Sequence, residues 1–168
     1  SLFRLTDFFT LFYYKFIEPN NTKDGLWWSN NLDSRSVSAW MGLSFELVCL
    51  NHHRQIKTAL GIAGVGTAIS TWRSKADKGD GIPGFQIDMI IERADRIIHL
   101  CEMKFSTDLY GITTSYEMKL RERMGLFRMA TKNKKTLVNT FVTTYGVANA
   151  KNKSIVHSEV TMDDLFNS

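Results

Sequence analysis

The chain has 168 residues, of which 43% are hydrophobic, 23% charged and 12% aromatic, and its formal net charge is +4. This composition provides enough apolar side chains for a substantial core and excludes an intrinsically disordered chain. No stretch approaches the roughly 18 consecutive apolar residues of a membrane-spanning helix, so we expect no membrane span. Cys49 and Cys101 lie in apolar runs and are too few for a disulfide scaffold, which predicts reduced core thiols in a cytoplasmic protein.

Residues 1–35 are predicted to form an aromatic N-terminal extension and linker. The first 28 residues hold nine of the twenty aromatic side chains of the chain. Thr6 or Asp7 is a suitable N-cap for a helix that runs to about Ile17, and the polar segment 19–34 reads as a loop. Because this extension is so apolar, we expect it to pack either on the core of this domain or on an upstream part of a longer polypeptide. Both alternatives stay open at this point.

The remaining residues, 36–168, are predicted to form one mixed α/β (α+β) domain. Apolar residues at helical spacing predict a second helix from Ser36 to Gly61. Alternation then predicts strands over residues 62–72 and 85–92, and the apolar run 96–105 predicts a central strand that is covered on both faces. A helix capped by Thr114 or Ser115, a strand over 136–145 and a short helical turn over 162–166 complete the order.

Asp88, Glu102 and Lys104 are the residues that point to chemistry. A three-residue loop between the second and third strands would set Asp88 opposite Glu102, and Lys104 shares the face of Glu102 because side chains alternate with a period of two. A two-residue loop would pair Asp88 with Cys101 instead and turn the two carboxylates to opposite faces. The first register would bring two carboxylates and an ammonium group together.

Such a trio suits metal-assisted phosphoryl chemistry. Carboxylate oxygens are the ligands that Mg²⁺ prefers, and a nearby lysine can stabilise charge on a phosphate. Glu46 offers a third carboxylate, since it is the only acid in the apolar segment 37–50. The alternative interpretation of Asp88, Glu102 and Lys104 is a cross-strand salt bridge without catalytic function.

Seven basic residues against one acid between positions 119 and 135 suggest a polyanionic partner, and a solvated helix face would produce the same pattern. The candidate contacts with a DNA backbone are Lys119, Arg121, Arg123, Arg128 and Lys132. His52 and His53 are interpreted as helix-end or surface residues, with phosphate or metal contact as the alternative. The sequence has neither a P-loop nor Cys/His spacing typical of a zinc site.

The segments GFQID (84–88) and CEMK (101–104), joined by a hairpin, resemble the PD-(D/E)XK nuclease superfamily. The longer stretches FRLTDFF, GFQIDMIIERADRIIHLCEMKFS, TLVNTFVTTYG and EVTMDDLF are similar to the C-terminal nuclease-like domain of prokaryotic archaeal-type AAA+ ATPases. Ile87 departs from the pattern, because the superfamily often has proline before the aspartate. The resemblance implies a restriction-endonuclease-like core, built as a helix, a three-stranded meander, a helix and a strand, over residues 36–168.

The same resemblance implies roles for individual residues. Asp88 and Glu102 would be ligands of Mg²⁺ or Mn²⁺, Lys104 the catalytic lysine, and Glu46 the helix carboxylate that supports the metal or its water. DNA would be the substrate, and an ATPase and a winged-helix domain would precede this region in the same polypeptide. Two functions are therefore expected as alternatives: a metal-dependent DNA phosphodiesterase, or a catalytically inactive module that binds DNA or a protein partner for the ATPase.

Overall fold

The structure, a computed structural model, describes residues 7–20, 24–74 and 84–167. The chain divides into two compact units, Ser1–Val48 and Cys49–Ser168. The boundary between the two units falls inside helix α3 (Arg35–Asn51). Across the described ranges, no helix combines the length and the apolar character that crossing a bilayer demands.

The first unit is organised around aromatic side chains. Helix α1 (Phe8–Phe12) continues as the π-helical turn η1 (Tyr13–Ile17), and its predicted cap is present, because the Asp7 carboxylate accepts a hydrogen bond from the Thr10 N–H. A short helix, α2 (Trp27–Asn31), lies within the segment that was predicted to be a loop. Rings from these elements pack at centroid distances of 5.2–5.7 Å against one another and against α3, the group comprising Phe12, Phe16, Trp27, Trp28 and Trp40. The aromatic extension thus packs on the helix that follows it in the chain.

The second unit contains a five-stranded mixed sheet, which confirms the predicted mixed α/β class. Its strands are β1 (Thr67–Ser74), β2 (Phe85–Arg93), β3 (Ile97–Lys104), β4 (Thr136–Thr143) and β5 (Ser158–Thr161), in that spatial order. Strands β1, β2 and β3 form an antiparallel meander, whereas β4 runs parallel to β3 and β5 parallel to β4. Strand β5 and the 3₁₀ helix η2 (Lys151–Ile155) were not predicted, because neither is long enough to show a clear period.

The helices of the second unit begin and end close to the predicted residues. The helix expected over 36–61 is interrupted at His52, so that α4 (His53–Ala59) is separate, and it ends where Gly61 has φ +69°. Helix α5 (Thr114–Thr131) is capped one residue earlier than expected, by Thr113, whose side chain accepts from the Tyr116 N–H. At η3 (Asp163–Leu165) the expected capping pair is present, since the Thr161 N–H donates to Asp164 at 2.7 Å.

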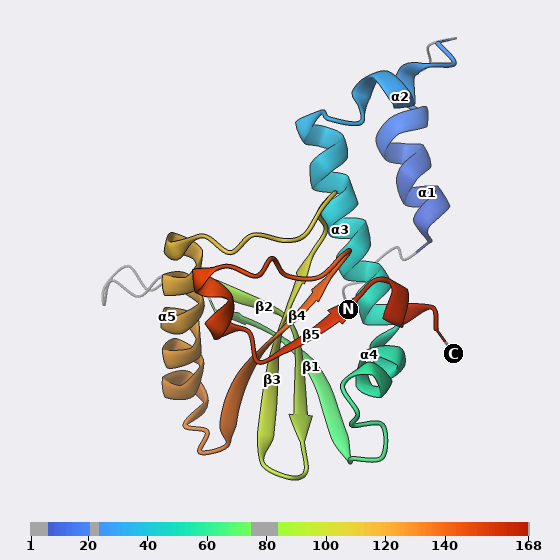
Figure 1. The fold of residues 1–168 in the computed structure, drawn as a ribbon. Helices are drawn as coiled ribbons and strands as arrows, with labels where there is room; N and C mark the ends of the chain where they lie inside the picture. Colours follow the sequence, from blue (N-terminus) through green and yellow to red (C-terminus); the bar gives the residue numbers. More distant parts are fainter. Residues whose placement is uncertain (1–6, 21–23, 75–83, 168) are drawn as a thin grey trace. The chain divides into compact units, whose positions relative to one another are not determined.

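Helix α5 covers one face of the sheet (Figure 1). Phe127 and Met124 of α5 pack on a group of buried side chains from the strands, Ile87, Ile90, Ile98, Leu100 and Leu137. Strand β3 is central, and residues 98–103 are all buried, as the apolar run predicted. This packing fixes which residues of α5 face the polar end of β3.

Candidate functional site

The β2–β3 hairpin has the register that the sequence required for a common site. Met89 pairs with Cys101 and Ile91 with His99, and the loop consists of the three residues 94–96. Arg96 adopts a left-handed conformation with φ +72°, which is the usual way to close a three-residue hairpin loop. The pairing of β2 with β3 ends at Met89 and Cys101, and the next residues along the two strands are Asp88 and Glu102.

Asp88 lies at an irregularity of β2 that the sequence did not predict. Ser70 of β1 pairs with Ile90 and Trp72 pairs with Ile87, so Asp88 and Met89 together face a single residue of β1. This is a β-bulge, a feature that re-aims side chains and is common beside active sites. The Asp88 carboxylate reaches the neighbouring strand and accepts a hydrogen bond from the Met103 N–H at 3.1 Å.

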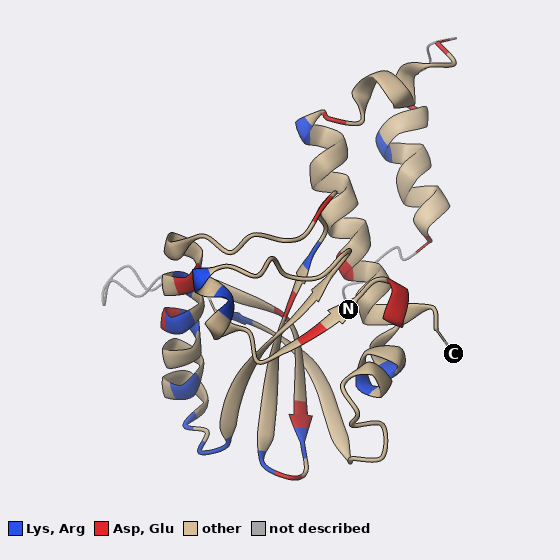
Figure 2. Ribbon diagram, in the orientation of Figure 1, with Lys and Arg blue, Asp and Glu red and all other residues tan. Residues whose placement is uncertain are grey.

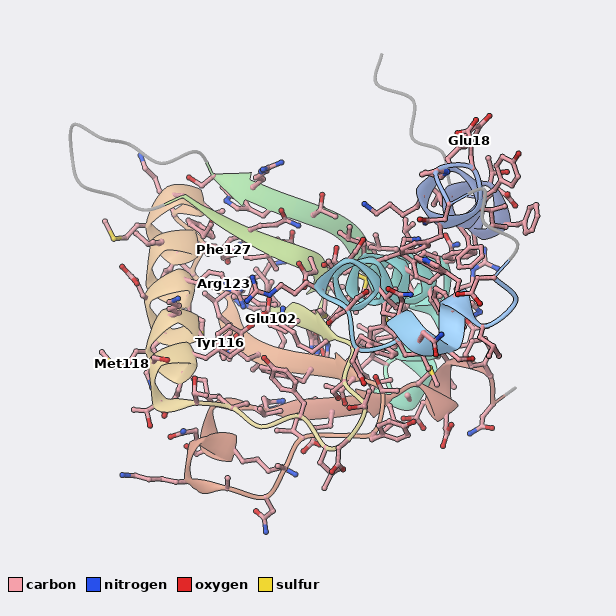
Figure 3. The ribbon with its side chains drawn as sticks, turned by 90° about the horizontal axis from the view of Figure 1, so that it is seen from above. Glu18, Glu102, Tyr116, Met118, Arg123 and Phe127 are labelled. Atoms are coloured by element: carbon pink, nitrogen blue, oxygen red, sulfur yellow. The ribbon has the colours of Figure 1, made fainter. Side chains whose placement is uncertain are left out.

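Glu102 is the centre of a buried polar cluster. Its side chain is 3% exposed, and Arg123 Nη1 lies 2.6 Å from Oε1. Oε2 accepts a hydrogen bond from the Tyr116 hydroxyl and lies 3.3 Å from Lys104 Nζ. Figure 3 shows Tyr116 and Arg123 extending from α5 toward Glu102 on the sheet, whereas Met118 of the same helix points away. A buried carboxylate needs such partners, because desolvating an unpaired charge is costly.

The surroundings shift the pKa values of Asp88 and Lys104 in the cluster. Burial raises the pKa of Asp88, and the negative charge of Glu102 raises it further. Burial alone would lower the pKa of Lys104, but Glu102 and Asp88 outweigh it, so that this pKa is raised and the ammonium stays charged. Lys104 Nζ also lies 5.8 Å from the ring centroid of Tyr116. The site therefore holds a charged lysine beside two carboxylates that repel each other.

Tyr116 and Arg123 are site residues that sequence reasoning did not assign to the site. Arg123 was interpreted as a contact with a DNA backbone, with a solvated helix face as the alternative. Its side chain is 12% exposed and pairs with Glu102, and its contact with DNA stays a prediction. The signal was present in the sequence, because residues 116, 120, 123 and 127 recur at helical spacing along the buried stripe of α5.

The remaining basic residues of α5 lie at its surface (Figure 2). Arg121 forms an ion pair with Glu117 one turn away, and the Arg128 guanidinium donates to the carbonyl groups of Asn133 and Lys135. Lys119 is exposed, and Lys132, with φ +51°, ends the helix. These four side chains remain candidate contacts for a polyanion.

Glu46 lies half-buried on α3 in the first unit, so its participation in the site stays a prediction. The two histidines have local contacts: the ring of His52 packs 5.0 Å from that of Phe166, and His53 Nδ1 lies 3.0 Å from the Leu50 carbonyl oxygen. Among the residues that the structure describes, no group of three or more His, Cys, Asp or Glu side chains is arranged to hold a metal ion. Any metal at Asp88 and Glu102 would thus need a further ligand.

A pocket of about 330 Å³ adjoins the cluster. It lies between the start of β2 and α5, and its walls include Phe85, Tyr116, Lys119 and Arg123. Tyr116 and Arg123 therefore belong both to the pocket and to the partners of Glu102. The pocket gives the cluster a neighbouring space that a ligand can occupy.

Comparisons with known proteins add little to this description. No family model and no curated protein matches the chain. A solved structure of a protein of unknown function, AF1548, is similar with 18% sequence identity and a TM-score of 0.44, over 70% of this chain and 64% of that chain. This chain thus spans less than two thirds of the length of AF1548.

Proposed function

We propose that the chain carries a metal-dependent phosphodiester hydrolase site of the PD-(D/E)XK type, with DNA as substrate. The observation that carries the proposal is that Asp88 and Glu102 adjoin the last pair of the β2–β3 hairpin, Met89 and Cys101, with Lys104 3.3 Å from Glu102. The bulge at Asp88 supports it, because bulges re-aim side chains and are common beside active sites. The order of meander, helix α5 and parallel strand β4 also agrees with the resemblance.

The donor set fits a hard divalent cation. Asp88 and Glu102 supply carboxylate oxygens, and burial followed by the charge of Glu102 raises the pKa of Asp88, a condition that a bound cation relieves. These two residues would hold Mg²⁺ or Mn²⁺, with Glu46 as the further carboxylate that the resemblance names. Such an ion, when bound, polarises a phosphoryl oxygen and lowers the pKa of a coordinated water.

The other residues of the cluster have roles that follow from their contacts. Lys104 keeps its proton and can stabilise negative charge that develops on the phosphate. Tyr116 and Arg123 donate to Glu102 and fix its orientation, as partners behind a metal ligand commonly do. The exposed basic side chains of α5 would contact the DNA backbone, and their contribution would weaken as salt concentration rises.

One observation favours the second candidate, a catalytically inactive nuclease-like module. Both carboxylate oxygens of Glu102 already have donors, from Arg123 on one side and from Tyr116 and Lys104 on the other. A cluster that is balanced in this way can be purely structural, and α5 would then bind DNA or a protein partner for a larger ATPase. In either case Cys49 and Cys101 are buried thiols rather than a disulfide, which supports action in the reducing cytoplasm.

Calorimetric titration with Mn²⁺ tests the proposal. We expect the wild-type chain to bind the ion and Asp88→Asn and Glu102→Gln to lose that binding, whereas the exposed Asp163→Asn serves as a matched control that keeps it. Plasmid cleavage with the same four proteins then tests turnover. If the wild type binds Mn²⁺ no better than Asp88→Asn, with an oligonucleotide present as well as without it, the hydrolase proposal is wrong and the inactive module stands.

A further inference from the structure

Of the three nitrogens of the Arg123 guanidinium, only Nη1 has hydrogen-bond partners in the described part of the chain. Nη1 donates to the Gln86 carbonyl at 3.0 Å and forms the ion pair with Glu102. Nε and Nη2 are buried and have no hydrogen-bond partner among the described residues. An unsatisfied buried donor is costly, and more so when the group carries a charge. An acceptor that bonded Nε and Nη2 would therefore stabilise this arginine.

The unpartnered nitrogens form one edge of the guanidinium plane. Nε and Nη2 point in parallel, and this geometry matches two oxygens of a carboxylate or a phosphate. Arg123 lines the 330 Å³ pocket, and the exposed Lys119 lies on the same wall. Two cationic side chains thus line the pocket, and in the described part of the chain the buried Nε–Nη2 edge of Arg123 has no acceptor.

The pocket also has the shape and the lining for a nucleotide. Its volume is near the lower end of ligand sites, which span about 300–1,000 Å³, and this suits a single small ligand. Phe85 and Tyr116 supply aromatic surface on which a base can stack, and among the described residues of the lining Glu122 is the only acidic one. The lining thus contains cationic side chains that suit a phosphate and aromatic side chains that suit a base.

The geometry points to a phosphate subsite: the pocket beside Glu102 binds a phosphate group of a nucleic-acid strand through Arg123 and Lys119, with the attached nucleoside against Phe85 and Tyr116. This inference deepens the proposed function and rests on it for the choice of a nucleic acid as ligand. Because Arg123 also holds Glu102, a phosphate that draws the guanidinium toward the pocket would release Oε1 of Glu102 for a cation. Binding of the strand and binding of the metal would then favour each other.

The experiment uses the full chain, metal-free, and follows the Arg123 Nε–H signal by NMR during titration with thymidine 5′-monophosphate, and with thymidine as the ligand that lacks phosphate. We expect the nucleotide to shift this signal and thymidine to leave it unchanged. Arg123→Lys keeps the charge and removes the two-nitrogen edge, so its affinity should fall about tenfold. Lys119→Gln, which leaves the buried ion pair intact, should weaken binding several-fold, and Arg54→Gln, an exposed arginine on α4, should not.

Dithymidine monophosphate separates the two sources of phosphate. Affinity equal to that of the monophosphate assigns the subsite to a backbone phosphate, and much weaker affinity assigns it to a strand end. The inference is overturned if thymidine binds as well as its monophosphate, or if Arg123→Lys and Lys119→Gln both bind the nucleotide as the wild type does. The two failures are distinguishable, because the metal-free titration with nucleotide measures the phosphate subsite and the Mn²⁺ titration measures the metal site.

Discussion

Replacing Glu102 by glutamine removes the charge that holds the buried cluster together. Arg123 and Lys104 would then be two cations facing a neutral amide, with side chains only 12% and 30% exposed. Breaking a buried pair by removing one partner costs about 3–5 kcal/mol, because the remaining charge is left uncompensated. Lys104 can turn partly to solvent, so we expect the lower half of this range, about 3–4 kcal/mol. For a chain of this length that loss lowers Tm by roughly 10 °C.

Thermal and urea unfolding followed by far-UV circular dichroism measure this effect. Glu122→Gln is the matched control, since Glu122 is an exposed residue on α5 and its replacement should change stability by no more than about 0.5 kcal/mol. The double variant Glu102→Gln/Arg123→Gln should recover part of the loss, because it removes the uncompensated guanidinium as well. If Glu102→Gln unfolds within about 1 kcal/mol of the wild type, Glu102 does not anchor a buried charged network and the reasoning fails.

Three further outcomes are expected. Burial and the charge of Glu102 raise the pKa of Asp88, so ionisation of Asp88 lowers the free energy of unfolding as pH rises through that pKa. Asp88→Asn should therefore be at least as stable as the wild type at pH 7. A lower urea midpoint of the variant would contradict this. Burial, followed by the charges of Arg93 and His157, lowers the pKa of His99 to about 4, so its contribution to stability should be complete above about pH 6.5 and diminish as pH falls toward 4. Its imidazole NMR signals should accordingly stay constant between pH 7 and 5.5, and titration in that interval would count against the buried neutral form. Thr113→Ala removes the cap of α5 and should cost about 1 kcal/mol in urea unfolding, with Thr113→Ser retaining most of the stability.

The parts of the fold that sequence reasoning predicted are those with a strong local period. The alternation of β2 and the apolar run of β3, with three residues between them, determine the hairpin register, because a slip of one residue would turn every buried side chain of one strand outward. The bulge at Asp88 has no such signal. It depends on how β1 pairs with β2, and residues 85–92 alternate in the sequence as if the strand were regular.

Partners from distant elements were the hardest part of the site to predict. Asp88, Glu102 and Lys104 lie on one hairpin, so counting residues was sufficient to bring them together. Arg123 comes from α5, and its basic neighbours made a surface role the simpler interpretation, although its spacing from Phe127 and Leu120 placed it on the buried stripe. An arginine at an inward helix position requires a buried acceptor, and Glu102 lies on the strand that was predicted to be covered on both faces.

The charges of the cluster bear on whether it is a structural salt-bridge network or a binding site for a metal and a phosphate. A purely structural network gains most when every buried polar group is satisfied, since a half-satisfied network is worse than an apolar core. Here Asp88 has a raised pKa, and Arg123 has two unpartnered nitrogens within the described residues. A divalent cation would relieve the first and a phosphate oxygen pair the second. Both features lie at one cluster around Glu102, which is what an incomplete binding site for a metal and a phosphodiester would show and a finished salt bridge would not.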